Sequence, residues 1–282
     1  MSRKMQIAAA LALASASVAA AQAADLPDRI VKAKTIKVAV NAIYPPMEFK
    51  DPQSGTLTGF DVDLGNALAK ELGVTFDWQE SAFEQMMPSL ATGRVDMILS
   101  GLNDRPDRRE TADFVDYLNS GAQFFVLAER AAEFKAPTDL CGKPVGSSRS
   151  TSFPKSIEDW SVANCQGGGR PAIQVSGTED TASARSQLKQ RRLDAAVQGS
   201  ETIAYAMSLE PGTYQPLGAP FTSTSQGIAF TKQDNQLRDA VLAALKKLMV
   251  DGTYGKIVAK WHLEASAAHQ VALNGAPLPE KP

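Results

Sequence analysis

Short apolar runs alternate with segments of helical apolar spacing in the first half of the chain. The runs predict strands and the spaced segments predict helices, in the order 35–40, 60–72, 74–78, 83–91 and 95–99. Gly73 directly follows the first helix and Gly93 follows the second, as expected for helix C-termini. A strand–helix–strand–helix–strand order predicts right-handed crossovers and a parallel sheet.

The same order returns in the second half. Strands are predicted from residue 144 and over 173–176 and 193–197, with helices over 151–160 and 178–190. Sequence identity between the halves is slight, so the repeat is one of architecture. A further strand over 227–230 and helices over 236–250 and 254–263 follow. The last stretch, 264–282, is rich in alanine and proline and is expected to be loosely held.

Small polar residues follow the predicted strands. Ligands of open parallel sheets bind beyond the carboxyl ends of the strands. These ends are residues 41–44, 80–83 and 100–103 in the first half and 147–152, 176–177 and 198–201 in the second. The first set also contains the aromatic residues Tyr44 and Phe83. Two halves that face each other would therefore enclose a ligand in a cleft.

The segment 94–110 has the clearest chemical signal. Its apolar run ends in Ser100, Gly101 and Asn103, and Pro106 then opens a helix with Arg108 in its first turn. Hydroxyl, amide and backbone N–H donors beside a guanidinium and a helix N-terminus attract an anion. The segment predicts a pocket for a small carboxylate.

Several of these candidates also have a purely structural interpretation. For Arg108 the alternative to a carboxylate clamp is one more solvated charge in a cluster with Arg105 and Arg109, and Arg109 is expected at the surface. Tyr44 fits ordinary core packing. Asp61 and Asp63 look like a carboxylate pair, but they lie in the first turn of a predicted helix, where negative charge is favourable. We therefore assign the two aspartates to the helix terminus.

Residues 1–24 have the pattern of a cleaved signal peptide. Arg3 and Lys4 precede an apolar, alanine-rich run over 7–18, and residues 21–23 form an A-x-A cleavage signal. The run is short for a bilayer-spanning helix, although a retained anchor is the alternative. Export places the protein in the periplasm. The chain length predicts one large domain or two domains of ordinary size.

The chain has two cysteines, Cys141 and Cys165. In an oxidising compartment an even pair favours one disulfide, with two free buried thiols as the alternative. Only two histidines are present, which argues against a zinc site, and no metal or cofactor is expected. Lys+Arg 29 against Asp+Glu 31 gives a net charge of −2. This balance argues against nucleic-acid binding.

Seven segments resemble the periplasmic solute-binding proteins of ABC importers, in the polar amino-acid class (family 3 type). They are YPPMEF (44–49), LTGFDVDL (57–64), MILSGLNDRPDR (97–108), DFVDY (113–117), GKPVGSSRSTS (142–152), LDAAV (193–197) and DGTYGKIVAKW (251–261). They occur in the family's order and extend over nearly all of the chain after residue 24.

The resemblance implies an α/β, two-lobed periplasmic-binding-protein fold of type II. Each lobe would be a βαβαβ-type, mostly parallel sheet with flanking helices, and two strands would cross between the lobes near 119–121 and 224–226. The implied parts are a signal peptide 1–24, lobe 1 over 25–119 plus 226–264, lobe 2 over 120–225, and a C-terminal tail 265–282.

The resemblance also implies a ligand site. The arginine at the position of Arg108 grips the ligand α-carboxylate, with hydrogen bonds from both lobes and two aromatic walls. The implied ligand-binding residues are Asn41, Tyr44, Glu48, Phe83, Ser100, Gly101, Asn103, Arg108, Thr151, Ser152 and Gln198.

Two positions depart from the family pattern. Gly199 stands where the family has an aspartate that holds the ligand ammonium, and Asn41 stands where binders of cationic amino acids often carry an aspartate. A buried ammonium needs an anion or several acceptors. Either Glu201, Glu48 or Asp104 substitutes, or the ligand has no ordinary α-ammonium group. An uncharged ligand is thus favoured over a basic one, and Gly199→Asp is expected to improve binding of ordinary α-amino acids.

The implied function is that of a monomeric receptor. It would bind a polar or uncharged amino acid, or a related small carboxylate, by hinge closure and deliver it to an ABC permease in the inner membrane. One alternative is an enzyme on the same fold, similar to cyclohexadienyl dehydratase, with Glu48 or Glu201 as general acid. Another is a ligand sensor that acts in trans.

Overall fold

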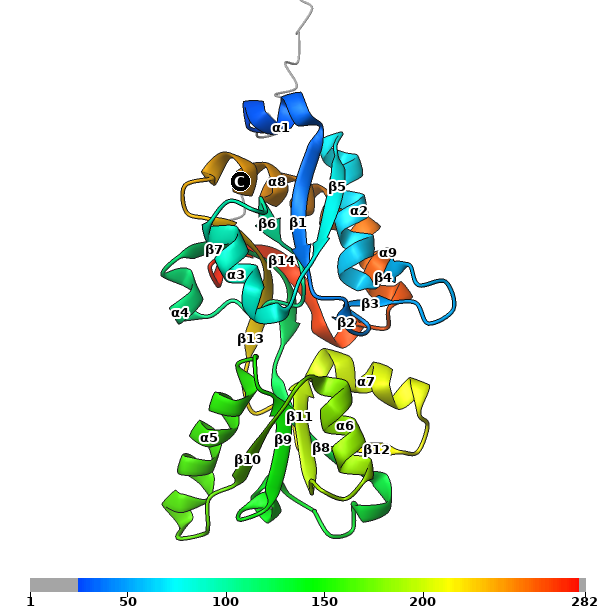
Figure 1. The fold of residues 1–282 in the computed structure, drawn as a ribbon, viewed down its shortest axis with the longest axis vertical. Helices are drawn as coiled ribbons and strands as arrows, with labels where there is room; N and C mark the ends of the chain where they lie inside the picture. The colour runs from blue at the N-terminus through cyan, green and yellow to red at the C-terminus, as the bar shows by residue number, and fades with distance from the viewer. Residues whose placement is uncertain (1–24, 279–282) are drawn as a thin grey trace, which may run out of the picture.

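The computed structural model describes residues 25–278 as two lobes joined by crossing strands (Figure 1). Lobe 1 contains a seven-stranded and a three-stranded sheet, and lobe 2 contains a five-stranded sheet. The predicted signal peptide, residues 1–24, lies outside the described residues. No helix among residues 25–278 is long and apolar enough to cross a membrane.

The seven-stranded sheet of lobe 1 has the order β15-β14-β7-β13-β6-β1-β5. Its strands are β1 (Thr35–Val40), β5 (Thr75–Glu80), β6 (Met97–Ile98), β7 (Ala112–Ser120), β13 (Thr224–Thr231), β14 (Ala267–Leu273) and β15 (Ala276–Pro277). Strands β5, β1 and β6 are parallel, as the first strand–helix repeat predicts. The other pairings are antiparallel, so the sheet is mixed rather than mostly parallel.

Helices cover both faces of this sheet, and apolar residues from both of its faces are buried in two core clusters. Along β1, Ile36 and Val38 pack into one core cluster and Ala39 packs into another on the opposite face. Helices α2 (Phe60–Leu72), α8 (Asn235–Val250) and α9 (Thr253–Lys260) cover the first face, and α3 (Phe83–Ala91) covers the second. The short helix α1 (Asp28–Ala33) precedes β1.

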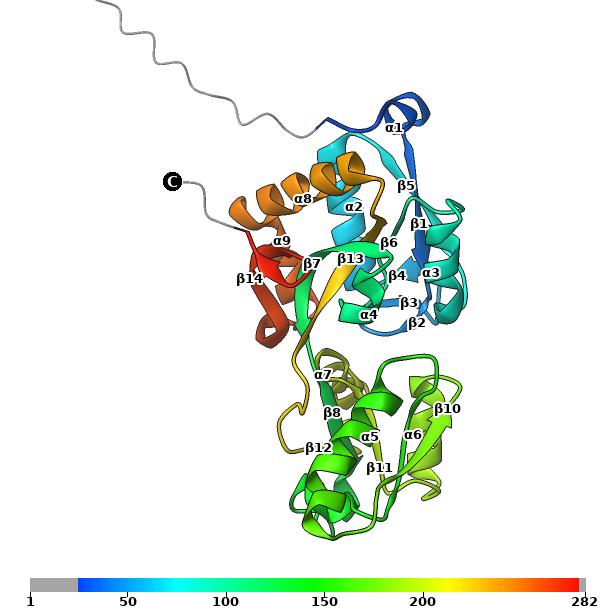
Figure 2. The same cartoon turned by 90° about the vertical axis from the view of Figure 1, so that its left-hand side faces the viewer.

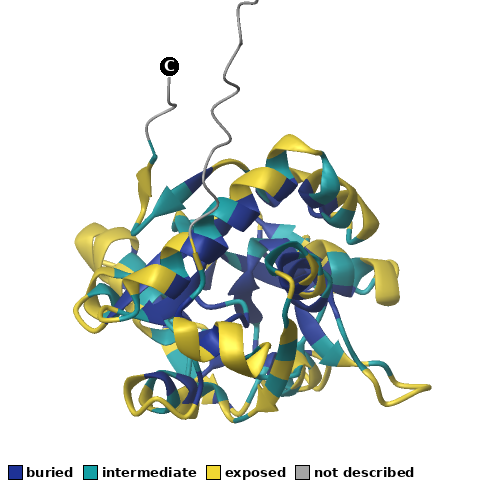
Figure 3. Ribbon diagram, turned by 90° about the horizontal axis from the view of Figure 1, so that it is seen from above, coloured by how far each residue is buried: buried dark blue, intermediate teal, exposed yellow. Residues whose placement is uncertain are grey.

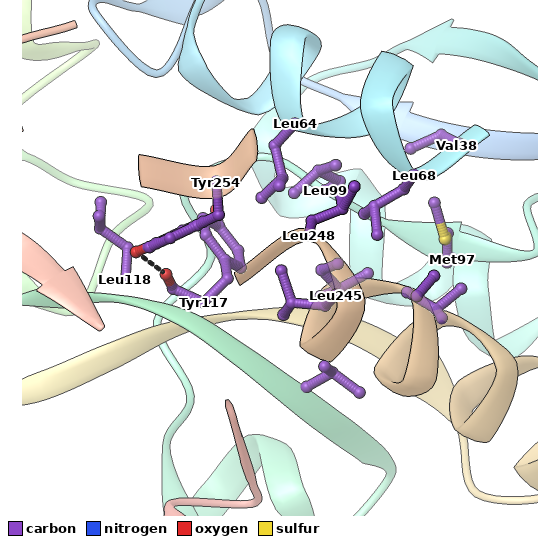
Figure 4. Packing of buried hydrophobic residues seen from close by; sticks show 14 of the residues in the cluster. Val38, Leu64, Leu68, Met97, Leu99, Tyr117, Leu118, Leu245, Leu248 and Tyr254 are labelled. Carbon is purple, nitrogen blue, oxygen red and sulfur yellow. Dashed lines mark hydrogen bonds between the residues drawn. The ribbon is translucent and has the colours of Figure 1, made fainter. Parts of the chain in front are cut away.

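Aromatic residues tie the helices to the strands of this core. Tyr254 of α9 donates a hydrogen bond to the carbonyl oxygen of Tyr117 in β7 over 2.7 Å (Figure 4). The ring of Tyr117 stacks on Phe60 at the start of α2. Figure 3 shows the buried residues in the interior and the exposed residues on the outer faces of the helices.

The sheet of lobe 2 has the order β10-β9-β11-β8-β12. Its strands are β8 (Ala122–Leu127), β9 (Pro144–Ser148), β10 (Gln174–Thr178), β11 (Ala195–Gly199) and β12 (Tyr214–Leu217), and its helices are α5 (Phe153–Asn164), α6 (Thr181–Lys189) and α7 (Ser200–Leu209). Strands β10, β9 and β11 are parallel, as the second repeat predicts, while β8 and β12 add antiparallel pairs.

The chain passes from one sheet to the other between Ser120 of β7 and Ala122 of β8, and returns before Thr224 of β13 (Figure 2). Strands β7 and β13 pair antiparallel, with Thr224 opposite Ser120. Gly121 fits this crossing because a Cβ there would lie 2.3 Å from the carbonyl oxygen of Thr222. The connection between the lobes is therefore a pair of hydrogen-bonded strands.

The expectation of a loosely held C-terminal stretch is wrong for the part that the structure describes. Strand β14 joins the seven-stranded sheet beside β7, and Val271 is buried. The backbone N–H of Asn274 donates to the carbonyl oxygen of Phe114, and the Asn274 side chain accepts from the Phe114 N–H. The alanine-rich composition gave no sign of a strand here, because its partner β7 lies about 150 residues earlier in the chain.

Asp116 of β7 anchors the turn after β14 by accepting from the backbone N–H of Gly275 over 2.8 Å. Burial and the neighbouring Asp104 carboxyl raise the pKa of Asp116 to about 7. The folded chain thus holds this proton more tightly than the unfolded chain does. The resulting stabilisation is present below about pH 4 and is lost as the pH rises to about 7.

We therefore expect Asp116→Asn, which retains an acceptor and cannot ionise, to stabilise the protein at pH 8 by up to about 4 kcal/mol. The advantage should vanish near pH 4, where the wild-type carboxyl is protonated. Unfolding midpoints from pH 4 to 8 measure it, and parallel curves for the two proteins would contradict the assignment.

The predicted disulfide is present in lobe 2. Cys141 and Cys165 are bonded, with a sequence separation of 24 and a Cα–Cα distance of 5.5 Å. Cys165, at the end of α5, packs in the core of that lobe. The bond closes a loop that contains β9 and α5.

We expect the double variant Cys141→Ala, Cys165→Ala to lose about 3.5 kcal/mol of unfolding free energy, from the entropy of an unclosed loop in the unfolded chain. Urea titration of both proteins measures the difference. A loss below about 1 kcal/mol would show that the loop is already restricted in the unfolded state.

Candidate functional site

A cleft with an interior volume of about 210 Å³ lies between the lobes. Its lobe 1 wall comes from residues at the carboxyl ends of the predicted strands and from Arg108, as the topology requires. Its lobe 2 wall comes from the loops after β9 and β10. The lining residues are Asn41, Ile43, Tyr44, Glu48, Ala82, Phe83, Glu84, Gly101, Asn103 and Arg108 from lobe 1, and Ser148, Arg149, Ser150, Thr151, Ser152, Phe153, Glu179, Asp180 and Thr181 from lobe 2.

Arg108 lines this cleft from the four-residue helix α4 (Pro106–Arg109). Its Nη1 donates to the carbonyl oxygen of Asn103 over 2.8 Å, and its guanidinium lies 5.6 Å from the centre of the Phe83 ring. Burial lowers the pKa of Arg108 to about 10, so the side chain remains charged at neutral pH. No carboxylate of residues 25–278 forms a salt bridge with it, so it can accept an anionic ligand.

Unlike Arg108, the two neighbouring arginines each form a salt bridge with a carboxylate. Arg105 pairs with Asp107, and Arg109 forms a bidentate ion pair with buried Asp104 at 2.5 and 2.8 Å. The expectation that Arg109 is an ordinary surface residue is therefore wrong. The pair also occupies Asp104, which leaves that carboxylate unsuited to a ligand ammonium.

Hydrogen bonds to neighbouring segments hold the loop after β6 in place. The backbone N–H of Gly101, whose φ is 49°, donates to the Oδ2 of Asp61 over 2.7 Å. Asn103 donates through Nδ2 to the hydroxyl of Ser152 in lobe 2 over 3.3 Å. Ser100 lies behind the cleft wall, where it accepts from the Asn41 N–H and donates to Oε1 of Glu48 over 2.8 Å. Ser100 thus supports the lining residues rather than joining them.

Two carboxyl groups meet beneath this loop. Asp61 is fully buried at the start of α2 and accepts from Gly101 and from the Tyr117 hydroxyl, so it does more than complement a helix dipole. Glu48, which is 1% exposed, lies beside Asp61. Burial and this neighbour raise the pKa of Glu48 well above its ordinary value, and burial raises that of Asp61 to about 6. Both shifts favour the protonated form of the carboxyl.

The space beside Gly199 is occupied by another carboxylate. A Cβ at Gly199 would lie 2.0 Å from Oε1 and 2.6 Å from Oε2 of Glu201. Glu201 is 3% exposed, and it accepts from Tyr44 Oη at 3.1 Å, Gln226 Nε2 at 2.8 Å and Ser120 Oγ at 2.7 Å. An aspartate at position 199 would therefore have to displace the Glu201 carboxylate from its three donors, which argues against the expectation that Gly199→Asp improves binding.

The lobe 2 wall differs in part from the sequence prediction. Thr151 and Ser152 line the cleft, and Thr151 also donates to the carbonyl oxygen of Ser148 over 2.8 Å. Gln198 does not line it, because its side chain is buried behind the wall and contacts Arg185.

Sequence reasoning missed several lining residues. Among them are Arg149 and three carboxylates, Glu84, Glu179 and Asp180. The only sequence signal for them was their position immediately after predicted strands or within the next turn. In this part of the chain, residues 25–278, no group of three or more metal-ligating side chains is present.

Known proteins share this architecture. The arginine-binding protein ArgT of Corynebacterium glutamicum is 29% identical over 253 residues, which cover 90% of this chain and 82% of that protein. The L-cystine-binding protein TcyJ of Escherichia coli K12 is 28% identical, covering 84% and 85%. The crystal structure of an ancestral amino acid-binding protein, described as a precursor of cyclohexadienyl dehydratase, superimposes with a TM-score of 0.74 at 31% identity, covering 83% and 98%.

The family model for bacterial extracellular solute-binding proteins matches residues 36–264. This match includes lobe 2, most of lobe 1, both crossing strands and every residue that lines the cleft. The chain therefore belongs to family 3 of the bacterial extracellular solute-binding proteins.

Proposed function

We propose that this protein is the periplasmic substrate-binding component of an ABC importer for an α-amino acid. The observation that carries the proposal is Arg108, a half-buried guanidinium in the interlobe cleft without a carboxylate partner among residues 25–278. A ligand carboxylate would supply the missing anion with two charge-assisted hydrogen bonds. The aromatic rings of Phe83 and Tyr44 form adjacent walls.

Ligand binding would change how the two lobes are arranged relative to each other. Donors from both lobes line one cleft, so a ligand contacts all of them only when the lobes are together. A ligand that binds one arrangement better shifts the population toward it. The permease would then recognise the ligand-bound arrangement and receive the amino acid from it.

The side chain of the ligand is polar and uncharged in our main hypothesis. Asn41 is neutral, and burial beside Asp61 raises the pKa of Glu48, which favours the uncharged form of that carboxyl. A cationic amino acid is the second candidate. It is favoured by Glu84, Glu179 and Asp180, which line the cleft and form no salt bridge within residues 25–278, and by the arginine-binding relative.

Calorimetric titration separates these candidates. L-glutamine, L-histidine, L-cystine and L-arginine, each with its decarboxylated amine, form a suitable panel. We expect one or more amino acids to bind and every matching amine to fail. If no α-amino acid binds, or if an amine binds as well as its parent, the proposal is wrong.

An enzyme remains a rival with one specific observation in its favour. Glu48 lines the cleft with a raised pKa, which is the property a general acid needs. However, Glu48 is almost fully buried, and its Oε1 accepts a hydrogen bond from Ser100. Incubation with prephenate and arogenate should therefore give no aromatic product. Measurable turnover would show that the protein is an enzyme rather than a transport component.

A further inference from the structure

Helix α7 of lobe 2 contacts lobe 1 through one face. Glu201 and Tyr205 are four residues apart and therefore project from the same side of the helix. Glu201 accepts a hydrogen bond from Tyr44 of β2 (Ile43–Tyr44), and the ring of Tyr205 lies 6.0 Å from that of Phe49 in β3 (Glu48–Lys50). Strands β2, β3 and β4 (Leu57–Thr58) form the small sheet of lobe 1, which lies above α7 in Figure 1.

Glu201 gathers donors from three different segments. Tyr44 belongs to the cleft wall, Ser120 ends the crossing strand β7, and Gln226 belongs to the returning strand β13. The carboxylate forms no salt bridge within residues 25–278, so these three neutral donors compensate its charge. A buried carboxylate that loses its donors is costly.

The arrangement of the lobes decides whether these donors are within reach. Tyr44 belongs to lobe 1 and Glu201 belongs to lobe 2. A rotation of lobe 2 about the crossing strands would therefore move the two side chains apart. Ser120 and Gln226 lie on the crossing strands themselves and would move less. The Tyr44–Glu201 bond is therefore the contact most sensitive to separation of the lobes.

We propose that Glu201 is an interlobe latch that holds α7 against the small sheet of lobe 1 and favours the contacted arrangement of the lobes before any ligand binds. Tyr205 on Phe49 provides an apolar contact one helical turn further along. The latch lowers the free energy that a ligand must supply to bring the lobes together, and so raises apparent affinity without contacting the ligand. Tyr44 belongs to both the cleft wall and the latch.

Distance measurements between spin labels test the latch in the absence of ligand. Val250 in lobe 1 and Val162 in lobe 2 are 89% and 59% exposed, and both native cysteines are in the disulfide, so Val162→Cys and Val250→Cys provide specific labelling sites. We expect one dominant distance in the wild type. In Tyr44→Phe, which keeps the ring and loses the hydroxyl, the ratio of contacted to separated populations should fall about 2- to 12-fold.

The matched control is Tyr214→Phe. Tyr214 donates to Glu210 over 3.2 Å within lobe 2, so this variant removes a similar Tyr–Glu bond that does not join the lobes. Its distance distribution should equal that of the wild type. Glu201→Gln should shift the populations in the same direction as Tyr44→Phe. An unchanged distribution in Tyr44→Phe, or an equal shift in Tyr214→Phe, would overturn the proposal, whichever ligand the cleft binds.

Discussion

Arg108→Ala should weaken binding of the amino-acid ligand by about 30-fold to several thousand-fold. Removal of one partner of a buried charge pair costs on the order of 2–5 kcal/mol. The loss should be large because the other guanidinium that lines the cleft within residues 25–278, that of Arg149, is exposed to solvent, whereas Arg108 is half-buried. Isothermal titration calorimetry with the best ligand of the panel measures the change.

Two variants make this result specific. Arg105→Ala removes a neighbouring arginine that pairs with Asp107 and does not line the cleft, so the affinity should stay within about twofold. Arg108→Lys keeps the charge and loses the planar pair of donors, so an intermediate loss is expected. If the affinity of Arg108→Ala for the ligand stays within threefold of the wild-type value, the ligand carboxylate binds elsewhere.

Gly199→Asp should destabilise the protein by about 2–4 kcal/mol, and it should weaken rather than improve ligand binding. The introduced aspartate must displace the Glu201 carboxylate from its three donors, and it places a second negative charge beside the first. Tyr44 loses its partner, and the cleft wall loosens. Thermal unfolding and calorimetric titration measure the two effects.

The double variant Gly199→Asp, Glu201→Ala tests this explanation. With the Glu201 side chain shortened, the introduced aspartate has room, and its carboxylate can reach the same region of the structure. We expect the double variant to regain at least half of the lost stability. If Gly199→Asp alone has wild-type stability and tighter binding, Glu201 moves away more readily than its hydrogen bonds imply.

Local signals in the sequence predicted several elements well. The helix predicted over 60–72 matches α2, because its apolar spacing and Gly73 are features of neighbouring residues. The strand predicted over 35–40 matches β1, in which the apolar residues at positions 36 and 38–40 are buried. The pocket around Gly101, Asn103 and Arg108 was also predicted, because the ends of parallel strands meet at one edge of a sheet.

Elements that depend on distant partners were missed. The sequence did not predict β14, whose residues pair with β7, or α7, whose face contacts the small sheet of lobe 1. The predicted parallel sheets became mixed because the crossing strands joined them from outside each repeat. None of these pairings leaves a periodic signal within a short window of the chain.

The sequence by itself determined the two strand–helix repeats, the disulfide partners and the loop for which we predict anion binding, because each follows from residue types at short spacing or from a single available partner. Only the tertiary structure decided which polar residues enter the cleft. In the structure, the side chains of Gln198 and Ser100 lie behind the cleft wall. Asp104 forms an ion pair with Arg109, and the Glu201 carboxylate occupies the space beside Gly199. The physical reason is that a buried charge takes whichever donors the assembled fold brings near it, and these donors come from segments far apart in the chain.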